Sequence, residues 1–313
     1  MVADLDTRVS VGSVELAHPV MTASGTSGHG AELASYFDLS SIGAVVVKSL
    51  SVMPWAGNPA PRLHPIEGGM INAVGLQGPG VERWFAESLP GLVASRAAVV
   101  VSIWGRTVEE FRDAAIAVAA GRSSRSGGGS IVAVEVNLSC PNLEGRRGIF
   151  AHDADVSAEV VRVCQVAGVP LWAKLSPNTD RLVEVAGAVS AAGAEAVTLI
   201  NTVVGLVLDP ESGRPVLGNG GGGVSGRVIH PMAVRAVSDV HAAMPDLPIV
   251  GVGGVVDVVS AANVLRAGAR AVQVGTATFA DPRASHRVAR DLDRWAVGRG
   301  IGRLADISPS PGR

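Results

Sequence analysis

Cysteine is scarce in this 313-residue sequence, which contains only two, Cys140 and Cys164. Two cysteines cannot build the disulfide framework of a small secreted protein. They are also too few to hold an iron–sulfur cluster or a thiolate zinc site within this chain. The seven histidines show no HxxxH or HExxH spacing, so no metal site is expected. The two thiols are typical of a cytoplasmic protein.

An excess of charge of one sign is missing as well, since the formal net charge is -2. Electrostatics therefore gives no reason to expect binding to nucleic acid or to an anionic membrane surface. No apolar run approaches the roughly 18 residues of a membrane span. The first ten residues are acidic and lack an apolar core, so no signal peptide is expected either.

Lysine is as rare as cysteine: it occurs only at Lys48 and Lys174, while arginine supplies the remaining positive side chains. Both lysines end short apolar runs, residues 44–47 and 171–173. An ammonium group is compact, whereas a guanidinium is a bulky planar fork, so the two are not interchangeable in a packed site. The two lysines therefore indicate a site, against the alternative that they survive by chance in an arginine-rich chain.

Short apolar runs alternate with longer amphipathic segments about eight times along the chain. The expected strands span residues 19–23, 44–48, 97–103, 131–136, 170–174, 196–200, 248–252 and 269–274. This alternation predicts an α/β fold, a (β/α)8 TIM barrel formed by residues 1–313 as one domain. We expect residues 9–16 to form an N-terminal hairpin that caps the bottom of the barrel. The long connections at residues 51–80 and 203–226 are expected over its C-terminal face.

The stretch that follows the strand at residues 131–136 gathers three polar groups, Asn137, Cys140 and Asn142. In parallel α/β folds, ligands bind at the C-terminal ends of strands. A thiol there is a nucleophile or a proton-transfer group, or else a small buried hydrophobe. The asparagines favour a site, because buried amides need hydrogen-bond partners. Residues 143–150 are either a lid or an ordinary exposed loop.

Glycines follow the last two expected strands, as Gly253-Gly254 and Gly275-Thr276. In barrels of this kind, the loops after strands seven and eight often bind a phosphate through backbone N–H groups. The alternative is that these glycines only form turns between a strand and the next helix. The strand ends together offer two ammonium groups, amides, one thiol and a phosphate cradle, without a carboxylate pair or a histidine. This set fits hydrolysis poorly and favours flavin redox chemistry on a small polar ring.

Two alternatives from other classes stay open on these residues. One is a phosphate-binding isomerase or lyase that uses Lys174 as a Schiff-base lysine. The other is a non-catalytic barrel kept as a scaffold, which the polar strand ends disfavour. Flavin absorbance of the purified protein distinguishes the first alternative from a flavoprotein.

Several motifs carry a more specific resemblance. They are ASGT at residues 23–26, GNPAPR at 57–62, NAVGLQGPG at 72–80, NLSCPN at 137–142, AKLSPN at 173–178, INT at 200–202, GVSG at 223–226, GVGG at 251–254 and GTATF at 275–279. From about Val9 to the last helix, the chain resembles the class 1 dihydroorotate dehydrogenases. GNPxPR with NAxGLQ is more similar to the B-type enzymes, which pass electrons to a partner subunit carrying FAD and a 2Fe–2S cluster, and from there to NAD.

The resemblance implies FMN-dependent oxidation of dihydroorotate to orotate in pyrimidine biosynthesis, with Cys140 as general base, hydride transfer to FMN, and a homodimer. Lys174 would face the flavin edge where negative charge grows on reduction. The implied FMN site is Ala23, Ser24, Gly25, Lys48, Ser49, Ser102, Asn137, Lys174, Ile200, Gly226, Gly253, Gly254, Gly275 and Thr276. The implied substrate site is Lys48, Asn72, Ala73, Val74, Gly75, Leu76, Asn137, Asn142, Asn201 and Thr202.

Three departures from the family pattern concern the electron acceptor and the partner more than the oxidation itself. Ser102 stands where the family often has an asparagine, and residues 51–55 lack the expected threonine or arginine. The tracts at residues 122–130 and 218–223 look like insertions. A related FMN oxidoreductase with a different dihydropyrimidine-like substrate is a further alternative.

Overall fold

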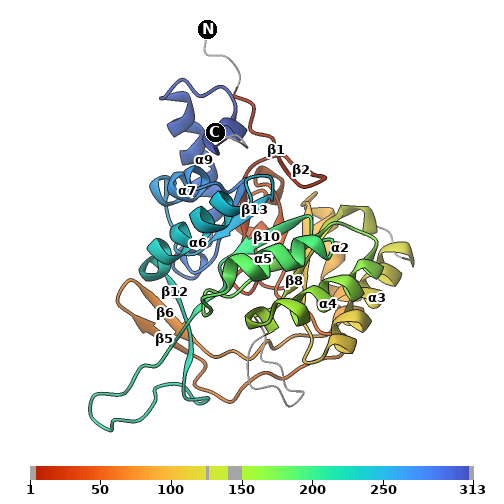
Figure 1. Ribbon diagram of the computed structural model, residues 1–313, viewed down its shortest axis with the longest axis vertical. Helices are drawn as coiled ribbons and strands as arrows, with labels where there is room; N and C mark the ends of the chain where they lie inside the picture. The colour runs from red at the N-terminus through yellow and green to blue at the C-terminus, as the bar shows by residue number, and fades with distance from the viewer. Residues whose placement is uncertain (1–4, 125–126, 140–149, 310–313) are drawn as a thin grey trace.

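The computed structural model (Figure 1) describes residues 5–124, 127–139 and 150–309. Eight parallel strands form one sheet in the order β3-β14-β13-β10-β9-β8-β7-β4. These strands are β3 (Val20–Thr22), β4 (Val45–Val46), β7 (Val99–Ile103), β8 (Ile131–Asn137), β9 (Leu171–Lys174), β10 (Ala196–Leu199), β13 (Ile249–Val252) and β14 (Ala271–Val274). The backbone N–H of Thr22 donates to the carbonyl of Ala44 at 3.2 Å, which links β3 to the start of β4 and brings the sheet round on itself. The expected (β/α)8 barrel is confirmed.

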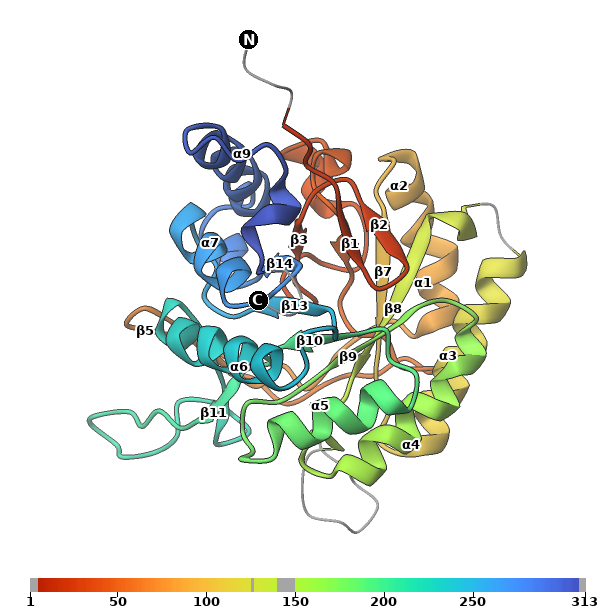
Figure 2. The same ribbon diagram turned by 45° about the horizontal axis from the view of Figure 1, so that its top comes forward.

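The helices surround this ring of strands, as Figure 2 shows. They are α1 (Val81–Glu87), α2 (Leu89–Ala94), α3 (Val108–Ser124), α4 (Ala154–Cys164), α5 (Leu182–Ala191), α6 (His230–Ala243), α7 (Val258–Arg266), α8 (Ala277–Ala280) and α9 (Ala284–Val297). Helix starts are set locally: the Asp257 side chain accepts from the N–H of Ser260, and the Asp153 side chain accepts from that of Val156. Among the described helices, none is long and apolar enough to cross a bilayer.

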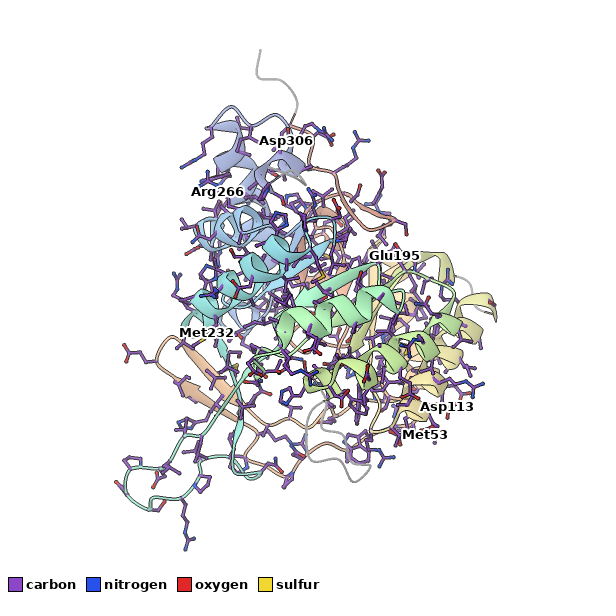
Figure 3. The ribbon with its side chains drawn as sticks, in the orientation of Figure 1. Met53, Asp113, Glu195, Met232, Arg266 and Asp306 are labelled. Atoms are coloured by element: carbon purple, nitrogen blue, oxygen red, sulfur yellow. The ribbon has the colours of Figure 1, made fainter. Side chains whose placement is uncertain are left out.

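A hairpin closes the amino end of the barrel, as expected from residues 9–16. It consists of β1 (Val9–Val11) and β2 (Val14–Leu16), paired antiparallel. Their inward side chains pack with Trp172 and with other buried residues of the barrel strands. Ser13, at the turn, donates to Glu195 through its backbone N–H at 2.8 Å and its hydroxyl at 2.6 Å. Glu195 is labelled in Figure 3. These contacts fix the hairpin at the end of the barrel opposite the carboxyl ends of the strands.

A second, smaller sheet covers the carboxyl end, at the other end of the ring from the hairpin (Figure 1). Its strands are β5 (Leu63–Ile66), β6 (Gly69–Asn72), β11 (Val203–Gly205) and β12 (Gly222–Gly226), in the order β11-β12-β6-β5. Both long connections lie over this face, as expected. Their pairing into one antiparallel sheet, with Asn72 opposite Gly223, was not predicted.

Two local predictions were wrong. The low-complexity sequence of residues 122–130 predicts a polar loop, but α3 continues to Ser124 and a 3-10 turn covers Gly128–Ser130. Serine and arginine are acceptable helix formers next to a long alanine-rich segment, which explains the extension. The sequence of residues 81–92 predicts one helix, but the helix is interrupted at Ser88, because Pro90 favours the first turn of a new helix.

We expect Cys164 to be inert toward thiol reagents in the folded protein. It is fully buried on α4, and burial raises the pKa of its thiol to about 12. A Cys140→Ala protein should therefore not react with a chromogenic disulfide at neutral pH, yet should release one equivalent of product in denaturant. Rapid labelling of the folded variant would contradict this prediction.

Candidate active site

A cavity of about 370 Å³ lies at the carboxyl ends of the barrel strands, beneath the small sheet. That volume is in the range of small-molecule and cofactor sites. The residues that the sequence singled out and that line this cavity are Ala23, Ser24, Gly25, Lys48, Ser49, Asn72, Ala73, Val74, Gly75, Leu76, Asn137, Lys174, Ile200, Asn201, Thr202, Gly226, Gly253, Gly254, Gly275 and Thr276. The strand ends therefore converge as the parallel topology requires.

The structure does not place every predicted residue in this lining. Cys140 and Asn142 lie outside the described residues, as do positions 143–149 of the segment considered as a lid. Ser102 is fully buried and reaches the cavity only indirectly, because its hydroxyl lies 2.9 Å from that of Ser49. Ser102 thus supports a lining residue and does not itself line the site.

Amide side chains in the cavity wall fix one another. Asn137 donates through Nδ2 to the hydroxyl of Ser49 at 3.2 Å. Its Oδ1 accepts from Nδ2 of Asn201 at 3.1 Å and from the backbone N–H of Ser139 at 3.2 Å. Because one amide can only donate from nitrogen and accept at oxygen, these contacts define the orientation of both asparagines.

Hydrogen bonds from neighbouring residues hold the loop of residues 73–76 in place. Asn72, at the end of β6, donates through Nδ2 to the carbonyl of Gly223 at 3.1 Å. The indole N–H of Trp55 donates to the carbonyl of Gly75 at 3.0 Å, and Asn58 donates to the carbonyl of Ala73 at 3.1 Å. The loop that was expected to contact substrate is therefore held in a defined conformation.

Lys48 follows β4 and lines the cavity with its side chain half-buried. Burial of the ammonium group, together with the positive charge of Arg62, lowers the pKa of Lys48 below its ordinary value of 10.5. Within the described part of the chain, no carboxylate forms an ion pair with Lys48. A bound anion would supply the missing counter-charge.

Lys174, at the end of β9, is the more deeply buried of the two lysines and does have a counter-charge. Its ammonium donates to the hydroxyl of Ser24 at 3.1 Å and to Oε1 of Glu135 at 3.4 Å. The sequence analysis missed Glu135, because it treated residues 131–136 as an apolar run. The available signal was a lone carboxylate two residues before Asn137, hence on the same face of the strand.

The glycines after β13 and β14 bring the backbone close to neighbouring elements. Gly254 has φ +65°, and a Cβ there would lie 2.7 Å from Cβ of His230 at the start of α6. A Cβ on Gly253, at φ +136°, would lie 2.6 Å from that of Ala233. Only glycine fits both positions, which leaves a backbone cradle at a helix N-terminus, as a phosphate site requires.

Ser225 is a second residue that the sequence analysis did not single out. It lies on β12, lines the cavity, and its hydroxyl accepts from that of Thr276 at 2.8 Å. The motif GVSG contained it, but nothing in the sequence showed that β12 would fold back next to the end of β14. In the described residues, no group of three or more histidine, cysteine, aspartate or glutamate side chains gathers as a metal site.

Comparison with known proteins defines the class of enzyme to which this barrel belongs. The family model described as dihydroorotate dehydrogenase matches residues 7–295. The chain therefore belongs to the dihydroorotate dehydrogenase family and is an oxidoreductase. The isomerase, lyase and scaffold alternatives are not retained.

Individual relatives show which type of dihydroorotate dehydrogenase the chain is most similar to among those compared. It is 42% identical over 303 residues to the protein named dihydroorotate dehydrogenase B (NAD(+)), catalytic subunit, of Geobacter sp. (strain M21), with 96% of this chain and 97% of the relative covered. It is 45% identical over 296 residues to the protein of the same name from Desulforudis audaxviator, with 94% of each covered. The expected likeness to the B-type enzymes is confirmed.

The fold is shared with a solved structure as well. The crystal structure of a dihydroorotate dehydrogenase from Eimeria tenella, in complex with ferulenol, superposes with a TM-score of 0.76 at 21% identity. The alignment covers 96% of this chain and 87% of that one. At this identity the likeness confirms the barrel fold alone.

Proposed function

We propose that this chain oxidises dihydroorotate to orotate in pyrimidine biosynthesis, with FMN bound in the cavity at the barrel mouth. The observation that carries the proposal is the placement of Lys48, Lys174 and the glycine cradle around one cavity. The cradle suits a phosphate, and the buried ammonium suits a ring system that becomes anionic on reduction. Both are groups of FMN.

The chemistry of the lining residues suits each part of FMN. The phosphate would bind to the N–H groups of Gly253, Gly254 and Gly275 and to the hydroxyl of Thr276. The ring and its side chain would be held by the other lining residues expected from the resemblance, which are Ala23, Ser24, Gly25, Lys48, Ser49, Asn137, Lys174, Ile200 and Gly226. When bound, FMN would supply the acceptor for the hydride that leaves the substrate.

Dihydroorotate offers a carboxylate together with ring carbonyl and N–H groups. Lys48 is suited to the carboxylate, because among the described residues the only charge found to act on its ammonium is that of Arg62, which is also positive. Asn72, Asn137, Asn142 and Asn201 would both donate to and accept from the ring. Cys140 would remove the proton from C5 as general base, for which reach matters more than a strongly lowered pKa.

The direct test is flavin binding followed by anaerobic reduction. The purified protein should carry yellow flavin absorbance that dihydroorotate bleaches without oxygen. FMN should bind apoprotein at least ~10-fold more tightly than riboflavin, because only FMN has the phosphate that the cradle accepts. Bleaching by another dihydropyrimidine but not by dihydroorotate would favour the alternative substrate, and absence of flavin binding would contradict the proposal.

We expect affinity for the product orotate to fall at alkaline pH as Lys48 loses its proton. The charged form binds the carboxylate, and the pKa of Lys48 lies below 10.5, so the loss begins at lower pH than for a free lysine. Spectral titration of the bound flavin with orotate measures this affinity. Lys48→Arg stays charged throughout and serves as control, because any fall that it shares comes from titration of the ligand. A constant ratio of wild-type to variant affinity would contradict the prediction.

The named relatives are catalytic subunits, so we propose an electron-transfer partner that carries FAD and a 2Fe–2S cluster and reduces NAD. This chain has only two cysteines, which agrees with a cluster held elsewhere. Reduced protein should then be reoxidised slowly by NAD alone, and quickly once the partner subunit is added.

The homodimer, the single domain and the cytoplasmic location remain predictions. Light scattering measures the molar mass and so tests the homodimer.

A further inference from the structure

Glu135 is a buried carboxylate that the proposed reaction does not use. It lies on β8 between Ser102 of β7 and Trp172 of β9, and no part of it is exposed to solvent. An ionised carboxylate in such a place is costly unless it is paired and its lone pairs are satisfied. The surroundings of Glu135 meet both conditions.

Three strands supply its partners. Oε1 accepts from the Lys174 ammonium of β9 at 3.4 Å. Oε2 accepts from the hydroxyl of Thr198 on β10 at 3.2 Å and from Nε2 of Gln273 on β14 at 2.8 Å. Neither Thr198 nor Gln273 lines the cavity, so the carboxylate is anchored below its floor.

Lys174 joins this anchor to the cavity. Its ammonium contacts Glu135 on one side and Ser24, which lines the cavity, on the other. Among the described residues, the only other charged side chain in the lining is Lys48, of the same sign, and Glu135 is the only ionisable group paired with Lys174. Without Glu135, the ammonium would be nearly buried with no counter-charge.

We propose that Glu135 is a positioning residue that acts through Lys174, holding the ammonium charged and directed to the barrel mouth and so setting the reduction potential of the bound flavin. This inference rests on the proposed function, since it assigns a role toward the flavin. Glu135 itself touches neither cofactor nor substrate. It would act through the Lys174 ammonium, which would stabilise the negative charge that develops on the flavin on reduction.

The test is the midpoint potential of the bound flavin in Glu135→Gln, an isosteric change that removes only the charge. An unpaired, desolvated ammonium gives up its proton more readily, so the preference for reduced over oxidised flavin should fall ~10-fold or more. For a two-electron couple this is a drop of about 30 mV. A potential equal to wild type, or higher, would overturn the proposal.

The matched comparison is a double-variant cycle with Lys174→Met. If Glu135 acts only through Lys174, the double variant E135Q/K174M should have the potential of K174M, and Glu135→Asp should recover part of the wild-type value. A further drop in the double variant would show that Glu135 acts independently of Lys174. The double variant lacks both charges, so it also provides a test if Glu135→Gln alone fails to fold.

A second measurement needs no flavin. The chain has only two lysines, so apoprotein labelled with ¹³C at lysine Cε should give two assignable side-chain signals. Glu135→Gln should move the Lys174 signal and leave that of Lys48 in place. If the wild-type protein binds no flavin, the proposed function fails while this measurement still tests the coupling. Unchanged signals would refute the coupling even in a working flavoenzyme.

Discussion

Cys140→Ala is expected to lower the rate of flavin reduction by dihydroorotate about 10³-fold at neutral pH while FMN stays bound. The proposed general base would be missing, and a positioned base typically contributes about 10²–10⁴-fold. Anaerobic stopped-flow measurement of flavin bleaching isolates this half-reaction from reoxidation. Retention of the flavin spectrum shows that the site itself is intact.

Two further cysteine variants sharpen this experiment. Cys164→Ala removes the other thiol, which is buried on α4, and should leave the rate within about a factor of two. Cys140→Ser should recover part of the rate as the pH is raised, because a hydroxyl gives up its proton less readily than a thiol. An unimpaired rate in Cys140→Ala would remove Cys140 from the reaction.

Lys174→Ala should be the other severe variant, with flavin reduction slowed about 10²–10³-fold and weaker FMN binding. The ammonium would no longer stabilise the charge that develops on reduction, and a single preorganised donor typically contributes this much. FMN affinity measured by fluorescence, and the bleaching rate with saturating FMN, separate binding from reduction. A bleaching rate equal to that of wild type would exclude this role.

Two matched controls distinguish charge from packing at this position. Lys174→Arg keeps the charge but places a larger planar group between Ser24 and Glu135, so we expect only partial activity. Ser24→Ala removes one neutral hydrogen bond to the ammonium and should cost about 10-fold or less. The order Ser24→Ala, Lys174→Arg, Lys174→Ala, from mildest to most severe, is the expected result.

The barrel and most of the cavity lining were predictable, because a parallel barrel brings the carboxyl ends of all its strands to one face. Once the strands ending at Lys48, Asn137 and Lys174 were placed in the sequence, convergence of these side chains followed from topology. The glycine cradle after β13 and β14 followed for the same reason. Both depend on the period of the apolar pattern, which is a local property of the sequence.

Contacts between remote segments were not predictable in this way. Glu135 stood within an apolar run, and its partners Thr198 and Gln273 lie 63 and 138 residues away in the chain. Nothing local marks them as neighbours. The pairing of β6 with β12 also joins segments that are far apart in the sequence. In neither segment do apolar and polar residues alternate clearly enough to predict a strand.

The pairing of β6 with β12 also bears on how this enzyme can be altered. Asn72, expected at the substrate, is opposite Gly223, and Gly226, expected at the cofactor, ends the same strand opposite Gly69. The paired strands β6 and β12 thus span both expected ligand sites, although they lie about 150 positions apart in the sequence. A chimaera that takes residues 63–72 from a relative would pair strands from two different proteins in the small sheet, unless residues 203–226 came from the same donor. The two segments should therefore be exchanged together.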